Sequence, residues 1–537
     1  MAKTLMAVDA GTGSVRAVLF SLEGEQLGCV QQEWTHREDP RYPGSMDFDW
    51  VHNWDLARGC IRGVIEQTGV DPHDIAAVST TCMREGIVLY DKDGQEIWAC
   101  ANVDARSDDE VAQLVHMNPE LEKQIYRESG QTYALGALPR LFWVKNKMPE
   151  VYEKTAMCTM FNDWLIYKMT GVFSSEPSNA CTTGIFDLKA RDWDDQIAAS
   201  IGLKTGIFPK ISECGTVVAQ VGAKGAAETG LAEGTPVVAG GGDAQLGCVG
   251  VGVVDANQAA IFGGSFWQYE YNTDEAKTDE HCRVRVNCHS VPGIWQYEAL
   301  AFKPGMVMRW YRDAFCQYEK ELSKTTGRDP YDLMNEKAKD IPAGCYGMMC
   351  AFSDVMNYIS WRHASPMFIN FDFDPDKFNR YTFYRAIMEN TAMVTYGHMQ
   401  LVRESTGNIP KEVVFASGAS KSELWCQILC DVLGIPVNVP NVKEATALGA
   451  AIMAGHGVGL FPDISATAKK LVHIGAEHGE PRDLHEALRG LAEDVRARAA
   501  NRGRPHHSLH VGGAGRLTHI INHTKGRKQH VYRKRRG

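Results

Sequence analysis

The feature that most constrains this 537-residue chain lies near its N-terminus, where two short apolar segments flank a polar, glycine-rich turn. Residues 5–8 read as a short buried strand, and residues 15–20 alternate as a second strand. Residues 9–14 between them read Asp-Ala-Gly-Thr-Gly-Ser, a composition typical of a turn. This order predicts a β-hairpin, which residues 26–32 are expected to extend as a third strand.

A helix and a fourth strand are expected to follow this hairpin. The helix is predicted over residues 47–66, because four apolar side chains recur there at helical spacing and share one face. These side chains are Trp54, Ala57, Ile61 and Val64. Residues 75–81 then read as a strand again. Three strands followed by a helix and a strand predict an α/β domain with a mixed sheet.

A similar arrangement recurs near the middle of the chain. Residues 236–245 end a strand in glycines and an acid, and residues 258–268 read as strand, glycine turn and strand. We therefore place a domain boundary near residue 253. Residues 253–475 alternate helix-like and strand-like runs, without the short-period repeat of a solenoid. The predicted fold class is α/β, with two domains facing each other across a cleft.

The charge distribution separates an acidic body from a basic tail. The net charge is -10, but residues 495–537 contain twelve Lys or Arg and no Asp or Glu, so the preceding residues carry about -22. Duplex nucleic acid requires clustered positive charge, so the body does not have the character of a nucleic-acid binder. The tail is expected to be poorly ordered, with a short helix at 484–495. A solvated segment, a tether to nucleic acid or anionic membrane, and a displaced reading frame near residue 476 are the interpretations that stay open.

Neither membrane insertion nor secretion is indicated. No apolar run approaches the ~20 residues of a membrane span. Residues 1–4 pass directly into a strand without a secretory h-region. The fifteen cysteines are scattered and form no CxxC pair, which favours free thiols in a reducing cytoplasm and disfavours a zinc site. We therefore expect a cytoplasmic protein.

The first candidate for chemistry is the N-terminal turn itself. Glycines allow the backbone to approach an anion closely, and successive amides can form a phosphate nest. The hydroxyls and guanidinium of this segment would add donors and positive charge, and the acid at the end of the first strand could hold Mg²⁺ through water. The residues concerned are Asp9, Gly11, Thr12, Gly13, Ser14 and Arg16. An ordinary hairpin turn is the alternative, and the absence of GxxxxGK[ST] excludes a P-loop.

The second candidate is the acid that follows glycines 240–242. A carboxylate just beyond a strand is exposed and rigidly placed, which suits a general base that accepts a proton from a hydroxyl nucleophile. Asp243 has this position, and Gln245 lies two residues further on. The alternative is an N-cap at the start of a helix over residues 244–249.

The third candidate is the segment 416–422, Ala-Ser-Gly-Ala-Ser-Lys-Ser. It lies between a predicted strand at 413–415 and a predicted helix at 423–433. Small residues at a helix start can admit an adenine ring or a phosphate. A tight strand–helix turn is the alternative. The nearby run 444–451 is rich in Ala and Gly and predicts a closely packed helix.

The fourth candidate is a group of charged residues that follows the strand at 75–81. Arg84 and Glu85 are adjacent, and Asp104 and Arg106 come soon after. Charges of both signs beside a buried strand could hydrogen-bond the hydroxyls of a polyol. A surface ion pair is the alternative.

Together these segments resemble the FGGY family of carbohydrate kinases. Seven segments occur in the family's order over about 475 residues, which is far more specific than any single motif. They comprise Asp9–Arg16, the charged pairs 84–85 and 104–106 counted together, residues 163–165, 178–180, 242–243 and 263–265, and residues 418–427 together with 444–451. The resemblance implies two actin-like, ribonuclease-H-like domains that close on ATP and a sugar-like substrate. We place the substrate and phosphate domain at 1–253, the nucleotide domain at 254–475 and an atypical basic tail at 476–537.

The resemblance also implies roles for individual residues, with ATP and Mg²⁺ as cofactors. Asp243 is expected to be the catalytic base, and Asp9 to position Mg²⁺ through water. Nucleotide and phosphate binding is expected at Gly11, Thr12, Gly13, Ser14, Arg16, Gly263, Gly264, Ser265, Gly418, Ala419, Ser422 and Gln427. Substrate binding is expected at Arg84, Glu85, Asn102, Asp104, Asp243 and Gln245.

Several positions depart from the family pattern. Asn102 stands where most pentulose kinases have Trp, which suggests a substrate more oxygenated or differently shaped than a plain ketopentose. Ser417 and Ala419 stand where the family usually has Gly, and Ser417 is tolerable only if its backbone avoids positive φ. Gly264 stands where glycerol kinases have Thr, so a backbone amide or the hydroxyl of Ser265 must serve there.

Residues 83–90, 97–106, 263–268 and 308–316 carry a closer similarity to one bacterial branch of the family. This similarity implies ATP-dependent phosphorylation of the quorum-sensing signal 4,5-dihydroxy-2,3-pentanedione at its terminal hydroxyl. A pentulose or glycerol kinase, a non-catalytic sugar or nucleotide sensor, and an actin-like filament ATPase are the alternatives. The expected partner is a small-molecule substrate. The family also allows a homodimer and a regulator from the sugar phosphotransferase system, whereas membrane insertion and nucleic-acid binding are not expected.

Overall fold

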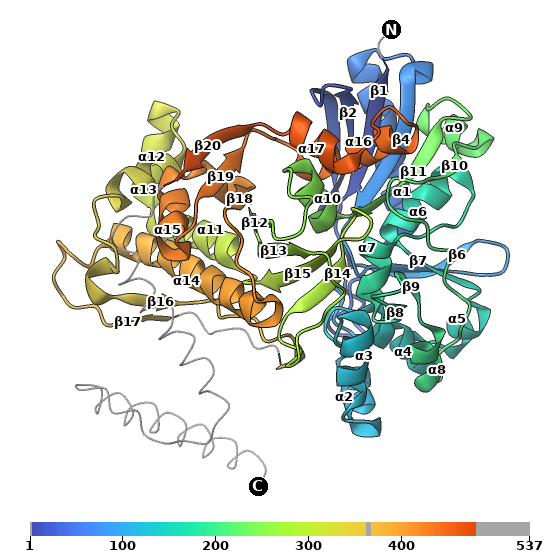
Figure 1. Ribbon diagram of the computed structural model, residues 1–537, viewed down its shortest axis with the longest axis horizontal. Coiled ribbons are helices and arrows are strands. Elements are labelled where there is room, and N and C mark those ends of the chain that lie inside the picture. The colour runs from blue at the N-terminus through green and yellow to red at the C-terminus, as the bar shows by residue number, and fades with distance from the viewer. Residues whose placement is uncertain (1–2, 361–366, 480–537) are drawn as a thin grey trace. The chain divides into compact units, whose positions relative to one another are not determined.

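Two large mixed β-sheets organise residues 3–360 and 367–479, which this computed structural model describes (Figure 1). The first sheet has six strands in the spatial order β10 (Val217–Gln220), β11 (Pro236–Gly242), β4 (Ile75–Cys82), β1 (Thr4–Ala10), β2 (Ser14–Ser21) and β3 (Gln26–Glu33). The second has seven strands in the order β14 (Arg285–Cys288), β15 (Trp295–Leu300), β13 (Trp267–Thr273), β12 (Ala259–Gly263), β18 (Val413–Ala416), β19 (Val437–Pro440) and β20 (Ile474–His478).

The two sheets repeat one pattern of strand pairing. In the first, β1 pairs antiparallel with β2 and parallel with β4. In the second, β12 pairs antiparallel with β13 and parallel with β18. Each sheet therefore contains a glycine-turn hairpin whose first strand also lies beside a parallel strand. This repetition agrees with the prediction of a mixed α/β fold in which the arrangement near the N-terminus recurs in the middle of the chain.

Helix α1 (Trp50–Thr68) follows the first hairpin, as the periodicity predicted. The side chain of Asp49 caps its start by accepting from the backbone amide of His52, and Gly69 ends it in the left-handed conformation. Its buried face packs in the same apolar core as the first sheet. That face includes the predicted residues Trp54, Ala57, Ile61 and Val64.

Shorter elements complete the fold. Three small sheets pair β6 (Glu96–Cys100), β5 (Ile87–Tyr90) and β7 (Met157–Met160), then β8 (Phe186–Asp187) with β9 (Asp192–Trp193), and β16 (Met349–Ala351) with β17 (Met367–Ile369). The helices before the second sheet are α2 (Asp108–Met117), α3 (Leu121–Ser129), α4 (Ala137–Lys147), α5 (Pro149–Lys154), α6 (Phe161–Thr170), α7 (Pro177–Ala180), α8 (Asp195–Ser200), α9 (Ala223–Thr229) and α10 (Asp243–Gly250). Those that follow are α11 (Pro304–Phe315), α12 (Gln317–Thr326), α13 (Pro330–Ala338), α14 (Arg380–Thr406), α15 (Glu423–Leu433), α16 (Ala445–Gly457) and α17 (Ile464–Leu471).

Helices α10 and α16 pack against each other, and α16 also packs on β1 and β4 (Figure 1). Glycines permit this close approach. A Cβ added to Gly449 would lie 2.0 Å from the carbonyl oxygen of Leu246, and one added to Gly250 would lie 1.7 Å from that of Ala445. The prediction of a closely packed helix at 444–451 is thereby confirmed. The packing also brings the first residues of both helices to the end of β1.

All fifteen cysteines are free thiols, as expected, and all except Cys29 are buried. Within residues 3–360 and 367–479, no helix combines the length and apolar character needed to cross a bilayer. The predicted tail boundary at residue 476 is wrong, because residues 476–478 belong to β20. The predicted short helix at 484–495 and the rest of the tail from residue 480 lie outside the described residues.

Candidate active site

The N-terminal turn is supported by two aromatic side chains that follow β3. Trp34 Nε1 donates to the carbonyl oxygen of Gly11 at 3.0 Å, and His36 Nε2 lies 2.8 Å from that of Thr12. Gly13 is exposed, and a Cβ there would meet no atom within 4 Å. An anion could therefore approach this backbone closely. Sequence reasoning missed Trp34 and His36, although two aromatic residues directly after the third strand were a usable signal.

Asp9, Arg16 and Glu444 form an ion-paired group beside this turn. The β1–β2 register places Asp9 opposite Arg16, and Arg16 Nε donates to Asp9 Oδ2 at 2.8 Å. The other side of the guanidinium lies 2.6 Å from Glu444 Oε2, at the start of α16. Desolvation raises the pKa of Glu444, while Arg16 opposes that shift. Arg16 is thus shared between two carboxylates, and the sequence argument had assigned Glu444 no role in the site.

Asp243 is the first residue of α10 and directly follows β11. The cap position belongs to Gly242, so the alternative reading of Asp243 as the N-cap is wrong. Its side chain is 41% exposed, and its Oδ1 lies 3.3 Å from Nε of Arg84. Desolvation raises the pKa of Asp243 to about 6, Arg84 counteracts the rise, and Glu85 and Asp9 reinforce it. A carboxyl group with this pKa is ionised at neutral pH and can accept a proton.

Arg84 and Glu85 are both buried, so the alternative of a surface ion pair is wrong. Arg84 forms a bidentate pair with Glu298, with Nη2 donating to Oε1 at 3.0 Å and Nη1 bound to Oε2. Glu85 Oε1 lies 2.6 Å from a terminal nitrogen of Arg285. Glu85 also has φ of 68°, a left-handed conformation that costs energy for a non-glycine residue and is common at functional sites.

The partners of this pair come from a buried polar face of the second sheet. Register places Arg285 of β14, Glu298 of β15 and Glu270 of β13 side by side. The neighbouring row consists of Asn287, Gln296 and Asn272. All six side chains are buried. Sequence reasoning missed them, because polar residues alternating with apolar ones usually indicate a strand face that meets water.

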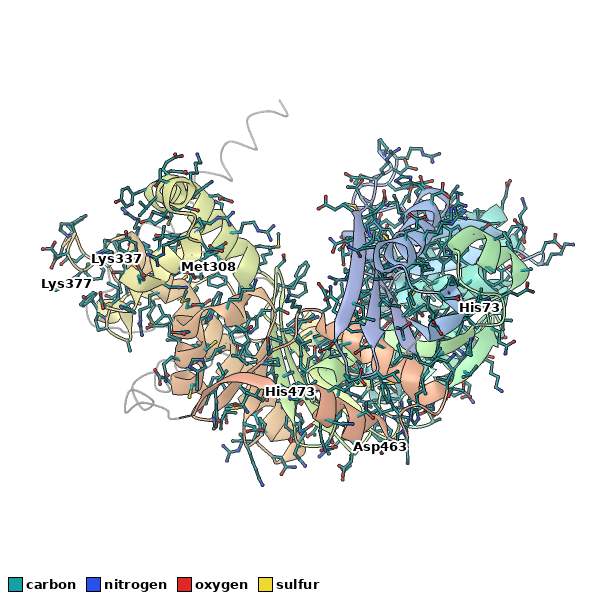
Figure 2. The ribbon with its side chains drawn as sticks, turned by 90° about the horizontal axis from the view of Figure 1, so that it is seen from above. His73, Met308, Lys337, Lys377, Asp463 and His473 are labelled. Carbon is teal, nitrogen blue, oxygen red and sulfur yellow. The ribbon has the colours of Figure 1, made fainter. Side chains whose placement is uncertain are left out.

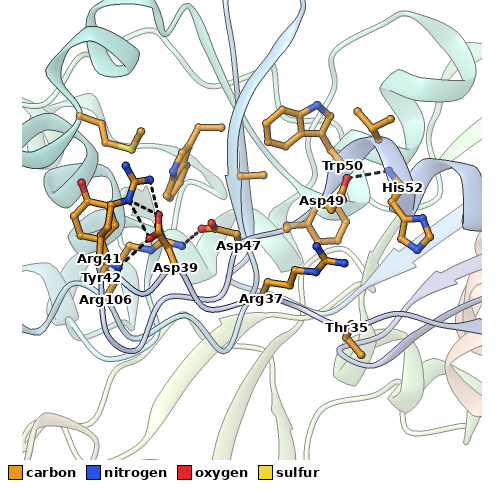
Figure 3. A pocket seen from close by; sticks show the side chains of 15 residues that line it. Thr35, Arg37, Asp39, Arg41, Tyr42, Asp47, Asp49, Trp50, His52 and Arg106 are labelled. Atoms are coloured by element: carbon orange, nitrogen blue, oxygen red, sulfur yellow. Dashed lines mark hydrogen bonds and ion pairs between the residues drawn. The ribbon is translucent and has the colours of Figure 1, made fainter.

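The segment at residues 102–106 is tied to its surroundings rather than open. Asp104 accepts from Arg106 Nε at 3.0 and 2.8 Å and from the backbone amide of Met46 at 2.6 Å. Arg106 also binds Asp47, where it borders a cavity of about 440 Å³ (Figure 3). Both oxygens of Asp104 are therefore occupied by protein donors, so any contribution of Asp104 to substrate binding would be indirect.

Asn102 connects this segment to the phosphate turn. Its Nδ2 donates to Thr12 Oγ1 at 3.0 Å. Arg140, a buried residue of α4, donates to the backbone carbonyls of Glu85, Asn102 and Asp104. One guanidinium therefore holds three predicted substrate positions in a fixed arrangement. Sequence reasoning missed Arg140, and its spacing within α4 gave no signal.

A second cavity, of about 670 Å³, brings together the predicted nucleotide segments. Its walls include Gly263, Gly264 and Ser265 from the β12–β13 turn and Gly418, Ala419 and Ser422 from the segment before α15. Helices α11 and α13 complete it with Met308 (labelled in Figure 2), Arg309, Arg312, Tyr331 and Asn335. Amides, hydroxyls and arginines around a space of this size suit a nucleotide.

The structure corrects one expectation about this cavity and distinguishes the two alternatives of another. Ser417 has φ of 78° and ψ of -168°, so it adopts the positive φ that sequence reasoning required it to avoid. This combination is almost confined to glycine, because a Cβ is strained there. The amide of Gly264 donates to the carbonyl oxygen of Phe266 at 3.0 Å, whereas the hydroxyl of Ser265 faces Arg309 at 3.4 Å. Ser265 is therefore the better placed of the two donors.

Two further predicted residues donate to side chains of the protein itself. Gln427 borders a neighbouring cavity and donates to Asp431 at 2.8 Å. Gln245 is fully buried and donates to Gln296 at 2.9 Å. Direct ligand contact is therefore poorly supported for either residue in this structure.

The described geometry defines a class of protein. The chain belongs to the FGGY family of carbohydrate kinases, whose N-terminal domain matches residues 4–250 and whose C-terminal domain matches residues 268–458. The crystal structure of xylulose kinase from Rhodospirillum rubrum has the same fold, with a TM-score of 0.82 and 22% identity over 93% of this chain and 99% of that one. The predicted fold of two actin-like, ribonuclease-H-like domains is confirmed.

Within this family, the chain is similar to proteins named autoinducer-2 kinase. It is 47% identical to the one from Enterobacter sp. (strain 638) over 488 residues, which cover 90% of this chain and 92% of that protein. It is 48% identical to the one from Yersinia enterocolitica over 485 residues, with 90% and 92% covered.

Proposed function

We propose that this chain phosphorylates autoinducer-2, 4,5-dihydroxy-2,3-pentanedione, at its terminal hydroxyl with ATP as phosphoryl donor. The observation that carries the proposal is the 47% identity to autoinducer-2 kinases over nine-tenths of the chain. The presence of an acid of suitable pKa beside a buried arginine and glutamate supports the same chemistry.

The acceptor side of the reaction rests on Asp243, Arg84 and Glu85. Arg84 and Glu85 would hydrogen-bond the substrate oxygens and orient the terminal hydroxyl toward Asp243. Asp243 would then accept the hydroxyl proton as the oxygen attacks the γ-phosphorus. Phosphoryl transfer of this type depends mainly on positioning and on stabilising charge.

The nucleotide side rests on the two glycine turns and the cavity of about 670 Å³. Gly11–Ser14 and Gly263–Ser265 would bind the phosphates through backbone amides and hydroxyls. Gly418, Ala419 and Ser422 would border the nucleoside. The side chain of Arg16 is about a quarter exposed, so it could turn from its carboxylate partners to a phosphate.

Magnesium is the divalent ion that suits the acids of this site. Mg²⁺ keeps several of its waters and is usually held by one or two carboxylates together with substrate phosphates. Asp9 at the phosphate turn fits that donor set, and Asp243 is close enough to interact with it electrostatically. When bound, the ion would neutralise phosphate charge, while Asp9 would hold its water shell.

The domain and cellular assignments belong to the same proposal. We assign residues 1–253 to the substrate and phosphate domain, and we extend the nucleotide domain from 475 to at least His478, because β20 pairs with β19. A cytoplasmic location follows from the need for ATP and from a product that its phosphate would prevent from diffusing through a membrane. A homodimer and a phosphotransferase-system regulator stay predictions.

The test is an ADP-release assay on a panel of acceptors: the dione, D-xylulose, glycerol and D-gluconate. We expect the dione to have the highest kcat/KM. Asp243→Asn serves as the inactive control, which shows that the released ADP reflects transfer. A higher kcat/KM for D-xylulose or glycerol would replace the proposal with a pentulose or glycerol kinase. Nucleotide binding without turnover of any acceptor would favour a sensor.

A further inference from the structure

The buried carboxylate of Glu298 connects the two predicted substrate residues, contacting Arg84 directly and Glu85 through Arg285. Its Oε1 accepts from Arg84 Nη2 at 3.0 Å and lies 3.4 Å from Arg285 Nη1. Its Oε2 binds Arg84 Nη1 and accepts from Asn287 Nδ2 at 2.9 Å. The side chain of Glu298 is fully buried. Both of its oxygens are thus occupied by donors from three residues.

This arrangement fixes the orientation of Arg84. A bidentate pair between guanidinium and carboxylate constrains both planes, because two parallel hydrogen bonds form together. The third nitrogen of Arg84 is left facing Asp243 at 3.3 Å. Arg285 in turn binds Glu85, so Glu298 holds one substrate residue directly and the other through Arg285.

The same carboxylate cancels positive charge that would otherwise face the substrate. Arg84 and Arg285 are balanced by Glu298 and Glu85, which leaves Asp243 as an additional negative charge. Glu270 lies in the same row, and neither of its carboxyl oxygens has a hydrogen-bond partner among the described residues. Desolvation raises the pKa of Glu270 well above its usual value, which favours its uncharged form. Arg84 and Arg285 are thus already paired, and Arg140 directs its donors to three backbone carbonyls, so a buried anion would find none of these three cations free. Burying an unpaired charge is strongly unfavourable.

We propose that Glu298 is a positioning and specificity-determining residue, which orients Arg84 for the acceptor and cancels its charge so that the site admits uncharged hydroxyl and carbonyl compounds and excludes sugar acids. The inference rests on the proposed function for the roles of Arg84 and Asp243, but not on which uncharged acceptor is used.

Three variants test the two parts of this role. Glu298→Gln keeps the shape and removes the charge, whereas Glu298→Asp keeps the charge and withdraws the carboxylate from Arg84. Glu389→Gln is the matched control, because Glu389 is a buried partner of Arg385 within α14 and does not contact the predicted substrate residues. Each is assayed with the acceptor that the wild type uses best, with D-gluconate as inhibitor.

Both Glu298 variants should raise KM for the acceptor about 10-fold or more, because a hydrogen bond to a charged group is worth about 1.5–3 kcal/mol. KM for ATP should change about 2-fold at most. Of these proteins, only Glu298→Gln should bind D-gluconate appreciably. Its inhibition constant for D-gluconate should be about 10-fold lower than that of the wild type. Glu389→Gln should lower Tm without either change.

An unchanged acceptor KM in both Glu298 variants would overturn the positioning role. If Glu298→Gln does not fold, the acceptor KM of Glu298→Asp still decides that role. Wild-type protein that binds D-gluconate as well as an uncharged acceptor, or a Glu298→Gln variant that gains no binding, would overturn the charge role. Calorimetry of D-gluconate binding requires no turnover, so this result is independent of whether the acceptor panel supports the proposed reaction.

Discussion

At the scale of single residues, Asp243 combines a partly exposed position with an environment that makes it more basic than an ordinary aspartate. Desolvation is the largest cause of its pKa of about 6, and the nearby charge of Arg84 limits the rise. The carboxylate form accepts a proton, so activity should be lost as pH falls through this value.

We therefore expect kcat/KM to increase with pH up to about 6 and to level off above it, because only ionised Asp243 accepts the hydroxyl proton. Asp243→Asn should lower kcat by ~10²–10⁴-fold, the usual effect of losing a general base, with ATP binding largely retained. ADP release across the pH range and nucleotide titration measure both quantities. A variant with more than half of wild-type turnover would exclude Asp243 as the base.

Ser417 presents the opposite case, a residue whose backbone conformation disfavours its side chain. Ser417→Gly should raise the free energy of unfolding by about 1 kcal/mol, because glycine adopts positive φ without strain. Urea unfolding measures the change. Ala419→Gly is the control, since Ala419 lies two residues away without positive φ and its replacement should lower stability. Equal effects of the two substitutions would argue against strain at Ser417.

At the scale of secondary structure, the contact between α10 and α16 sets the positions of two charged residues. Asp243 begins α10, and Glu444 immediately precedes α16. The helices approach so closely that glycine is required on both sides of the contact. Any increase in their separation would move Asp243 and Glu444 relative to the turn after β1.

Gly449→Ala should lower the free energy of unfolding by about 3 kcal/mol, the upper part of the usual range for overpacking, and should also reduce turnover. The added Cβ would meet a backbone oxygen at 2.0 Å, which cannot move without moving α10. Gly59→Ala in α1 is the control, because its nearest neighbour is the flexible end of Gln32 at 3.4 Å. That change should stabilise the helix by about 0.5–1 kcal/mol. Similar destabilisation by both variants would contradict the packing argument.

At the scale of the whole molecule, the two large sheets are linked by charge as well as by packing. Arg84 and Glu85 follow a strand of the first sheet, and their partners Glu298 and Arg285 belong to the second. The second sheet ends with β20, which pairs antiparallel with β19. The tail from residue 480 lies outside the described residues.

Truncation after Val495 should leave turnover and Tm within error of the full chain, because a basic segment with few large apolar residues cannot offset the entropy of ordering. Thermal unfolding and the ADP-release assay measure both. Truncation after His473 is the comparison, since it also removes β20 and should lower Tm. A cooperative loss of folding and turnover on truncation after Val495 would show that the tail is part of the second domain.

Strong local signals in the sequence were enough to predict four features: the hairpin around Gly11–Gly13, the face of α1, the helix that begins after Ser422, and Asp243 directly after β11. Each depends on turn chemistry or periodicity within a few residues. The family resemblance then ordered these segments and implied the fold. It did not determine where Gln245 and Gln427 would lie, because both stand on helices whose buried and cavity-facing sides depend on the neighbouring elements.

The surroundings of the candidate site, by contrast, depend on contacts between distant parts of the chain. Glu298 and Arg285 lie about 200 residues from Arg84 and Glu85 along the chain, and no local pattern relates them. Their alternation with apolar residues is the same whether a strand face meets water or another part of the protein. The two cases differ energetically, because charges that are buried away from water must pair with one another, whereas charges that meet water need not. The packing of the two sheets therefore converts an ordinary polar strand face into the support for the proposed acceptor site.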